Sequence, residues 1–239
     1  MKNSTPGRPI ALIVGASRGL GVAVATEYLR LGYEVYGTVR SDAHTPLHDL
    51  REAGSDALHI ERVDVTSTGE IAALHDRLAA HLRGRAIDVL FVVAGVSLAP
   101  QDARAIDMSD ADIVTTMLTN AIAPLRVIEG LDDLLGPDAT IAVMSSGQGS
   151  IGRNETGGFE VYRASKSALN QLMRSYAARR GTDRPLLLMA PGWVQTDMGG
   201  TGAPLTVSES IPALVATVEQ QRGIPGLRYL DRHGEPVPW

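Results

Sequence analysis

The chain has 239 residues, a formal net charge of -5 and a hydrophobic fraction of 44%, which is enough for one large domain with a buried core. Its Lys and Arg residues are scattered, so the charge pattern argues against nucleic acid as a partner. The absence of cysteine excludes disulfides and thiol chemistry and fits a reducing cytoplasm. No apolar run approaches the ~20 residues of a membrane span, and the polar start predicts a flexible N-terminus over residues 1–8. We therefore expect a cytoplasmic protein without a membrane partner.

Short β-branched apolar runs alternate with longer segments of helical periodicity, which predicts a parallel sheet with helices on both faces. The predicted strands are Ile10–Val14, Glu34–Val39, Leu58–Val63, Asp88–Val93, Thr140–Met144, Leu186–Met189 and Leu227–Leu230. The predicted helices are Gly19–Leu31, Pro46–Ala53, Ser67–Leu82, Ser109–Leu135, Phe159–Arg180 and Val207–Gln221. Because no linker interrupts the series, we expect one doubly wound α/β Rossmann domain over residues 1–239, with a mostly parallel seven-stranded sheet.

Two long loops follow predicted strands, at Ser145–Gly158 and Pro191–Pro204. Ligands of doubly wound sheets bind beyond the carboxyl ends of the strands, so these loops should border the active site. We interpret residues 191–222 as a substrate-side loop and lid. The part that should move over the substrate is Asp197–Pro204, which contains three glycines.

A glycine-rich turn, Gly15-Ala16-Ser17-Arg18-Gly19-Leu20-Gly21, follows the first strand and opens a helix. Glycine lets the backbone approach a pyrophosphate, while the helix N-terminus offers free N–H groups and partial positive charge. The turn therefore predicts a dinucleotide site. The expected contacts are Gly15, Ser17, Arg18, Gly19, Leu20 and Gly21. The alternative is that the glycines only make a tight turn from strand to helix.

The end of the second strand bears on the choice of cofactor. In Rossmann folds an acid about 20 residues beyond the glycines binds the ribose hydroxyls of NAD, whereas a nearby Arg accommodates the additional phosphate of NADP. Here the strand ends with Val39 and Arg40, and Arg18 lies in the glycine turn. Guanidinium groups bind phosphate through paired hydrogen bonds, so we expect NADP(H). Asp42 leaves NAD open, and a solvated loop position is the alternative for Arg40.

Tyr162 and Lys166 stand four residues apart in a predicted helix, which places them on one face. Tyr has a free pKa near ~10, and a neighbouring cation stabilises the phenolate and lowers that pKa. The pair can therefore act as a general acid toward a carbonyl oxygen. Packing and solubility are the alternative reasons for such a pair.

Two further polar residues precede this pair in the chain. Ser146 ends the fifth strand, where its hydroxyl can donate to a developing oxyanion, and Ser145 is the alternative. Asn120 lies four residues before Pro124, which cannot donate a hydrogen bond to the Asn120 carbonyl. A local opening of the helix there would let Asn120 hold a water, whereas a simple Pro kink is the other interpretation.

Taken in chain order, these motifs resemble the short-chain dehydrogenase/reductase family over nearly the whole length. The resemblance implies a catalytic tetrad, in which Tyr162 transfers the proton and Ser146 orients the carbonyl. Lys166 would lower the pKa of Tyr162 and bind the nicotinamide ribose, and Asn120 would hold a relay water. Hydride would pass to or from the nicotinamide.

The same resemblance implies further cofactor contacts. Val39 stands where NAD-type members carry the acid, and Arg40 stands one place on, as in NADP-type members. Asp64 and Val65 resemble the pair that forms the adenine pocket, although an Asp at a strand end is otherwise usually a turn or cap residue. The other contacts expected from the family are Ala94, Gly95, Tyr162, Lys166, Pro191, Gly192, Val194 and Thr196.

Finer features resemble the carbonyl-reductase branch that includes the C-factor and sniffer proteins. They are the runs Tyr162–Asn170 and Gly192–Gly200 and the terminal Val237–Trp239. Two departures from the family pattern are Val14 in place of Thr and Val92-Val93 in place of two Asn residues. Adjacent parallel strands bring these positions together, so apolar residues on both sides predict a packing change with the chemistry intact.

We therefore expect an NADP(H)-dependent carbonyl reductase or alcohol dehydrogenase acting on a small molecule. One alternative is a cofactor-binding regulator without turnover, and another is a nucleotide-sugar epimerase or dehydratase, which needs a larger region after Pro191. Family members usually pair through the helices predicted at Ser109–Leu135 and Phe159–Arg180, so a homodimer or homotetramer is expected. His44 and His48 show no metal-site pattern and no carboxylate at a recognised spacing, so no metal is expected.

Overall fold

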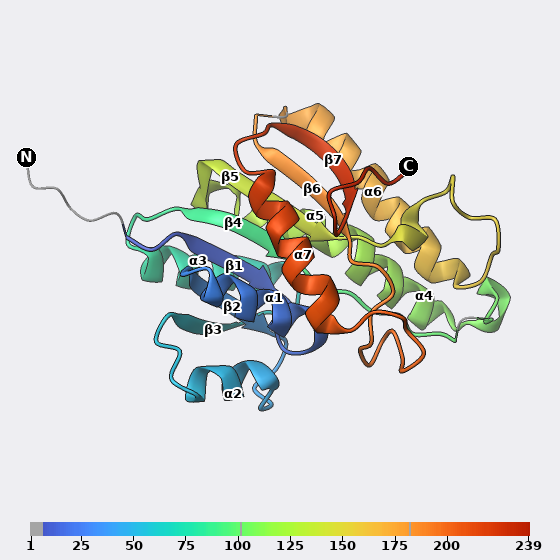
Figure 1. Ribbon diagram of the computed structural model, residues 1–239, viewed down its shortest axis with the longest axis horizontal. Helices are drawn as coiled ribbons and strands as arrows, with labels where there is room; N and C mark the ends of the chain where they lie inside the picture. Colours follow the sequence, from blue (N-terminus) through green and yellow to red (C-terminus); the bar gives the residue numbers. More distant parts are fainter. Residues whose placement is uncertain (1–6, 101, 182) are drawn as a thin grey trace, which may run out of the picture.

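The computed structural model describes residues 7–100, 102–181 and 183–239 of a single α/β domain. One parallel sheet of seven strands runs in the order β3-β2-β1-β4-β5-β6-β7 (Figure 1). Its strands are β1 (Ile10–Val14), β2 (Glu34–Val39), β3 (Leu58–Arg62), β4 (Ile87–Val92), β5 (Leu135–Met144), β6 (Pro185–Ala190) and β7 (Gly226–Asp231). This confirms the predicted doubly wound fold. Residues 1–6 of the expected flexible N-terminus lie outside the described residues, and Gly7 and Arg8 are exposed.

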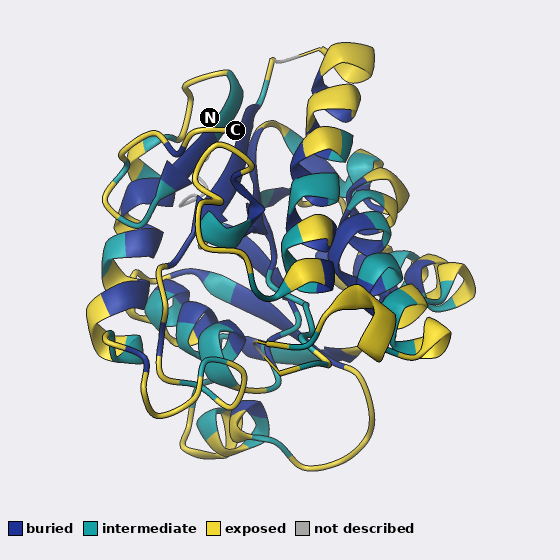
Figure 2. Ribbon diagram, turned by 90° about the vertical axis from the view of Figure 1, so that its right-hand side faces the viewer, coloured by how far each residue is buried: buried dark blue, intermediate teal, exposed yellow. Residues whose placement is uncertain are grey.

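Helices cover both faces of the sheet. They are α1 (Gly19–Arg30), α2 (Pro46–Glu52), α3 (Thr68–Leu82), α4 (Asp110–Met117), α5 (Ala123–Gly130), α6 (Glu160–Arg180) and α7 (Val207–Gln220). Leu12 of β1 belongs to the core shared with α3, α5 and α6, whereas Ile13 belongs to the core shared with α1, α2 and α7. Side chains alternate along a strand, so strands buried on both faces are apolar throughout (Figure 2).

The switch point of the sheet lies between β1 and β4, because the strand order reverses there. Chain segments that leave β1 and β4 must diverge at this point, which opens a crevice at the carboxyl edge of the sheet. The glycine turn leaves β1 at Gly15, and a loop leaves β4 at Val93. Both segments therefore border the place where a ligand of this fold binds.

The predicted helix Ser109–Leu135 is wrong in its end, whereas the local opening expected at Asn120 is present. Between α4 and α5 the chain forms a π turn at Leu118–Ile122, and the N–H of Ala123 bonds to the carbonyl of Leu118. Pro124 has no N–H, and the wider turn accommodates this loss. The helix ends at Gly130, and β5 begins at Leu135, five residues before the predicted Thr140, because Leu135 pairs with Ile87 of β4.

The segment Asp110–Gly130 has 21 residues and a mean hydropathy of 1.2, which is long and apolar enough for a membrane span by those two measures. The expectation that no run approaches this length therefore needs qualification. In the structure the segment contains the π turn, and Ala121, Val127 and Ile128 are buried in the core beside the sheet. Core packing accounts for its apolar character.

The region 191–222, expected to be loop and lid throughout, divides into two parts. Residues 207–220 form α7, whose Ile211, Leu214 and Val215 are buried in the core shared with α1. Only residues 191–206 form an irregular segment after β6. Any lid is therefore confined to that segment, because α7 is an integral part of the helical layer.

Candidate active site

The glycine turn leaves no room for a side chain at two of its glycines, Gly15 and Gly21. Gly15 has φ +91°, and a Cβ there would lie 2.7 Å from the Ala94 backbone. A Cβ on Gly21 would lie 1.9 Å from the Gly15 carbonyl oxygen. The N-terminus of α1 has no side-chain cap and no acidic residue in its first turn, so its N–H groups suit an anion. The turn therefore fits the pyrophosphate of a dinucleotide, with Ser17, Gly19 and Leu20 half-buried in it.

The end of β4 lies directly against this turn. Ala94 donates its N–H to the Val14 carbonyl at 3.0 Å, and Gly95 follows at the same edge. Val14 pairs in register with Val92, and both side chains are buried. The predicted proximity of the two departures from the family pattern is therefore confirmed, and apolar contact replaces a polar pair there.

The carboxyl ends of β2 and β3 bring together the residues expected to bind the adenosine half. Arg40 is exposed, and its charge contributes to a lowered pKa of Asp64. The larger cause is hydrogen bonding, since Thr66 donates to Asp64 Oδ1 from its N–H at 2.9 Å and its hydroxyl at 2.7 Å. Oδ1 of Asp64 thus accepts the hydrogen bonds that form a local turn with Thr66. Val65, the next residue after Asp64, is buried. Asp42, which left NAD open, pairs with Arg62 at 3.3 Å.

The segment after β6 packs over the glycine turn. Thr196 Cγ2 lies 3.8 Å from where a Cβ on Gly19 would stand. Gly192 has φ +89° and turns the chain after Pro191, whose carbonyl accepts a hydrogen bond from Ser210 at 2.7 Å. These contacts place Thr196 directly against the glycine turn.

An ion pair holds the segment after β6 to the glycine turn. Buried Val194 forms a bridge with Leu205, which closes the segment on itself. Arg18, expected to flank a phosphate, pairs instead with Asp197 at 2.7 Å. Both of these side chains are exposed, so this contact is weak and can exchange for another partner.

Tyr162 and Lys166 lie at the start of α6, on its face toward the crevice. Lys166 Nζ lies 5.9 Å from the centre of the Tyr162 ring and donates to the Met144 carbonyl at 2.9 Å. Ser146 follows β5, and its hydroxyl interacts with that of Tyr162. Ser145 instead donates to Asn170 Oδ1 at 2.7 Å inside the core. Of the two serines left open by the sequence, Ser146 is the one that faces Tyr162.

Burial dominates the electrostatics of the pair. It raises the pKa of Tyr162, and the hydrogen bond from Ser146 offsets part of this increase. Burial also lowers the pKa of Lys166 to about 8. The expected lowering of the Tyr162 pKa by Lys166 is not seen, because the amine lies over the ring and bonds to Met144. Tyr162 is thus protonated at neutral pH, as a proton donor must be.

Asn120 stands in the π turn, so the predicted opening of the helix is confirmed. Its side chain is fully buried and clamps the backbone of Val96: Oδ1 accepts from the Val96 N–H at 2.8 Å, and Nδ2 donates to the Val96 carbonyl at 2.8 Å. Nδ2 also donates to Ser165 Oγ at 3.0 Å. The side chain was expected to hold a water. Here it ties the loop after β4 to α6.

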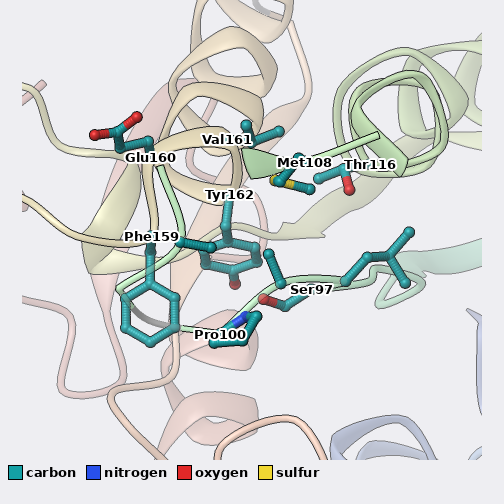
Figure 3. A pocket seen from close by; sticks show the side chains of 11 residues that line it. Ser97, Pro100, Met108, Thr116, Phe159, Glu160, Val161 and Tyr162 are labelled. Atoms are coloured by element: carbon teal, nitrogen blue, oxygen red, sulfur yellow. The ribbon is translucent and has the colours of Figure 1, made fainter. Parts of the chain in front are cut away.

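A small pocket opens beside Tyr162, with an interior of about 10 Å³ (Figure 3). Tyr162 projects into it from α6, and its other walls come from the start of α6, from α4 and from the loop after β4. Its lining residues are Ser97, Leu98, Ala99, Pro100, Ala103, Met108, Thr116, Phe159, Glu160, Val161 and Tyr162. None of the residues from the loop after β4 or from α4 was predicted. The signal was available, since this loop leaves the sheet at the switch point.

His44 lies near two carboxylates, contrary to the sequence expectation. One turn of α2 brings Asp49 and Glu52 to the imidazole, with distances of 3.6 Å and 3.3 Å. All three side chains are exposed, and their ligand atoms lie within 4.8 Å of one another. Exposed His and acid clusters commonly serve as solvated ion pairs.

The buried amine predicts a pH dependence of stability. The sequence has two lysines, so few groups of this kind titrate in the alkaline range. Between the folded pKa of about 8 and the ordinary 10.5, the unfolded Lys166 binds a proton that the folded one has lost. Stability contributed by this group therefore rises with pH across that window, by up to about 3 kcal/mol.

We expect Lys166→Met to be more stable than the unsubstituted chain at pH 7.5 and to lose more than half of this advantage by pH 9.5. Urea unfolding of both proteins at the two pH values measures the difference. A stability difference that does not change with pH would show that Lys166 is not buried as described.

Known proteins resemble this chain in sequence and in fold. A family model described as short chain dehydrogenase matches residues 9–203. The chain is similar to a short-chain dehydrogenase/reductase from Burkholderia multivorans with bound NADP, with 50% identity, a TM-score of 0.91 and coverage of 97% of this chain and 100% of that one. It is also similar to the carbonyl reductase Sniffer of D. melanogaster, with 30% identity, a TM-score of 0.85 and coverage of 97% and 99%. C-signal of Myxococcus xanthus is 36% identical over 136 residues, which are 56% of this chain and 82% of that relative.

Proposed function

The chain belongs to the short chain dehydrogenase family, and from this premise we propose that it interconverts a carbonyl and an alcohol with NADP(H). The observation that carries the proposal is the meeting of three groups beside one pocket. Tyr162 projects into the pocket, the Ser146 hydroxyl interacts with the Tyr162 phenol, and Lys166 lies over the Tyr162 ring. A glycine cradle for a dinucleotide opens at the same edge of the sheet.

In the direction of reduction, bound NADPH supplies a hydride to the carbonyl carbon. Tyr162 donates its proton to the carbonyl oxygen, so the product is a neutral alcohol. Ser146 donates a hydrogen bond to that oxygen and orients it. Lys166, which donates to the Met144 carbonyl, would bind the nicotinamide ribose and would favour the phenolate that forms. Asn120 positions the loop after β4 through Val96, and thereby one wall of the pocket.

The preference for NADP(H) over NADH rests on charge. Arg40 follows β2, and the next acid in the chain, Asp42, is paired with Arg62. Arg18 is held by an exposed ion pair with Asp197 that a phosphate can displace. If the phosphate displaces Asp197 from Arg18, the segment after β6 loses its ion pair with the glycine turn. We therefore propose Asp197–Pro204 as a lid that moves over the substrate.

Two further expectations stay proposals. We propose a cytoplasmic homodimer or homotetramer that associates through α4, α5 and α6. The exposed Val114 on α4, which is 63% accessible, is an apolar contact available to such an interface.

The direct test is NADPH oxidation, followed by absorbance, with a panel of aldehydes, ketones and quinones. We expect turnover with several members, and slower turnover with NADH at equal concentration. A Ser145→Ala variant is the matched control for Ser146→Ala, since Ser145 points into the core. Binding of NADPH without turnover of any carbonyl compound would instead support the alternative function, a cofactor-binding regulator.

A further inference from the structure

The pocket beside Tyr162 has an unusual polar feature on an otherwise mostly apolar wall. Leu98, Pro100, Met108 and Phe159 provide apolar surface (Figure 3). Thr116 of α4 lines the same space, is only 1% exposed, and its Oγ1 has no hydrogen-bond partner in the part of the chain that the structure describes. A buried hydroxyl without a partner is destabilising and therefore needs an explanation.

Helical Thr and Ser residues usually resolve this problem locally, by donating to the carbonyl four residues earlier. This chain does so elsewhere: Thr26 donates to the Val22 carbonyl at 2.8 Å, and Ser175 donates to the Gln171 carbonyl at 3.1 Å. Thr116 makes no such bond although it has the same helical setting. Its hydroxyl is therefore available to a molecule in the pocket.

The pocket also constrains the size of that molecule. Its interior is about 10 Å³, which is room for about one water-sized group. Phe159 narrows it: the residue has φ +48°, a strained value for an aromatic residue, and its ring meets Tyr162 edge-on at 6.4 Å. Only a compact group, such as one hydroxyl of a substrate, fits beside Thr116 without displacing these walls.

We propose that Thr116 determines substrate specificity, and that the preferred substrate is a compact carbonyl compound whose apolar body carries one hydroxyl group. The reacting carbonyl bonds to Tyr162 and Ser146, and the second group bonds to Thr116, whose hydroxyl can donate or accept. The inference rests on the proposed carbonyl chemistry. It adds a polar contact on the wall that faces away from the cofactor cradle.

The test compares benzaldehyde with its 2-, 3- and 4-hydroxy derivatives. These derivatives vary the distance between the reacting carbonyl and the hydroxyl group that would bond to Thr116. We expect the unsubstituted chain to favour at least one hydroxylated aldehyde in kcat/KM, and the isosteric Thr116→Val to lose about 3- to 10-fold of that preference. Electronic effects of the hydroxyl cancel, since each aldehyde is compared between the two proteins. Thr116→Ser keeps the hydroxyl and should retain the preference.

Thr140→Val is the matched control, because Thr140 of β5 is also fully buried with an unpartnered hydroxyl but does not line the pocket. It should leave the preference unchanged. A second measurement does not need turnover: the shift in unfolding temperature caused by each aldehyde with saturating NADP. A hydroxyl-dependent shift that Thr116→Val removes, without turnover, would refute the proposed reaction and keep the Thr116 site. Equal preference in Thr116→Val and the unsubstituted chain, by both measurements, would overturn the inference.

Discussion

Replacing Tyr162 with Phe should lower kcat by about 10²- to 10⁴-fold and leave the affinity for NADPH nearly unchanged. The substitution removes only the hydroxyl that donates the proton, and the ring keeps its edge-on contact with Phe159. Lys166 also keeps its bond to the Met144 carbonyl. Steady-state rates and a fluorescence titration of NADPH, made on one preparation, separate the loss of chemistry from any loss of binding.

Tyr176→Phe is the matched control for this experiment. Tyr176 is buried on the same helix, about four turns nearer the C-terminus, and its hydroxyl interacts with Arg180 outside the pocket. We expect the kcat of the Tyr176→Phe variant to equal that of the unsubstituted chain. Near-normal turnover by Tyr162→Phe would mean that another group supplies the proton, and the assignment of the catalytic centre would be wrong.

Arg40→Ala should weaken NADPH by about 10- to 100-fold and NADH far less. A hydrogen bond to a charged group contributes about 1.5–3 kcal/mol, which corresponds to one to two decades of affinity. NADH lacks the phosphate, so the contact does not exist for it. Because Arg40 is exposed, added salt should also weaken NADPH more than NADH. Paired titrations of both cofactors at two salt concentrations measure these effects.

Arg62→Ala tests whether the loss is specific. Arg62 ends the neighbouring strand β3, is 54% exposed and pairs with Asp42. Arg62→Ala therefore changes the surface charge by the same amount as Arg40→Ala. We expect little effect on NADPH. A preference of the unsubstituted chain for NADH, or an equal loss of both cofactors in Arg40→Ala, would refute the NADP assignment while leaving the oxidoreductase proposal in place.

Local features of the fold could be predicted because their signals lie in short stretches. β1 and β2 were placed at their observed bounds, since both are short, mostly apolar runs buried on both faces of the sheet. The glycine turn could be identified because only residues without a Cβ fit the approach of Gly15 to Ala94. The pairing of Tyr162 with Lys166 follows from helical periodicity, which depends on sequence spacing alone.

Contacts between distant segments could be decided only by the tertiary structure. The sequence cannot show that Arg18 pairs with Asp197, 179 residues away, or that Asn120 clamps Val96. Adjacent Ser145 and Ser146 differ in role because only one of them faces Asn170.

The amino-acid sequence by itself determined the order of strands and helices and the dinucleotide turn, since each follows from local sterics or periodicity. Only the tertiary structure decided the electrostatics and the shape of the site. Burial lowers the pKa of Lys166 to about 8 and raises that of Tyr162, and desolvation depends on every segment packed around a group. The wall that includes Thr116 exists for the same reason: it forms where α4, α6 and the loop after β4 meet, and no one of these segments encodes it alone.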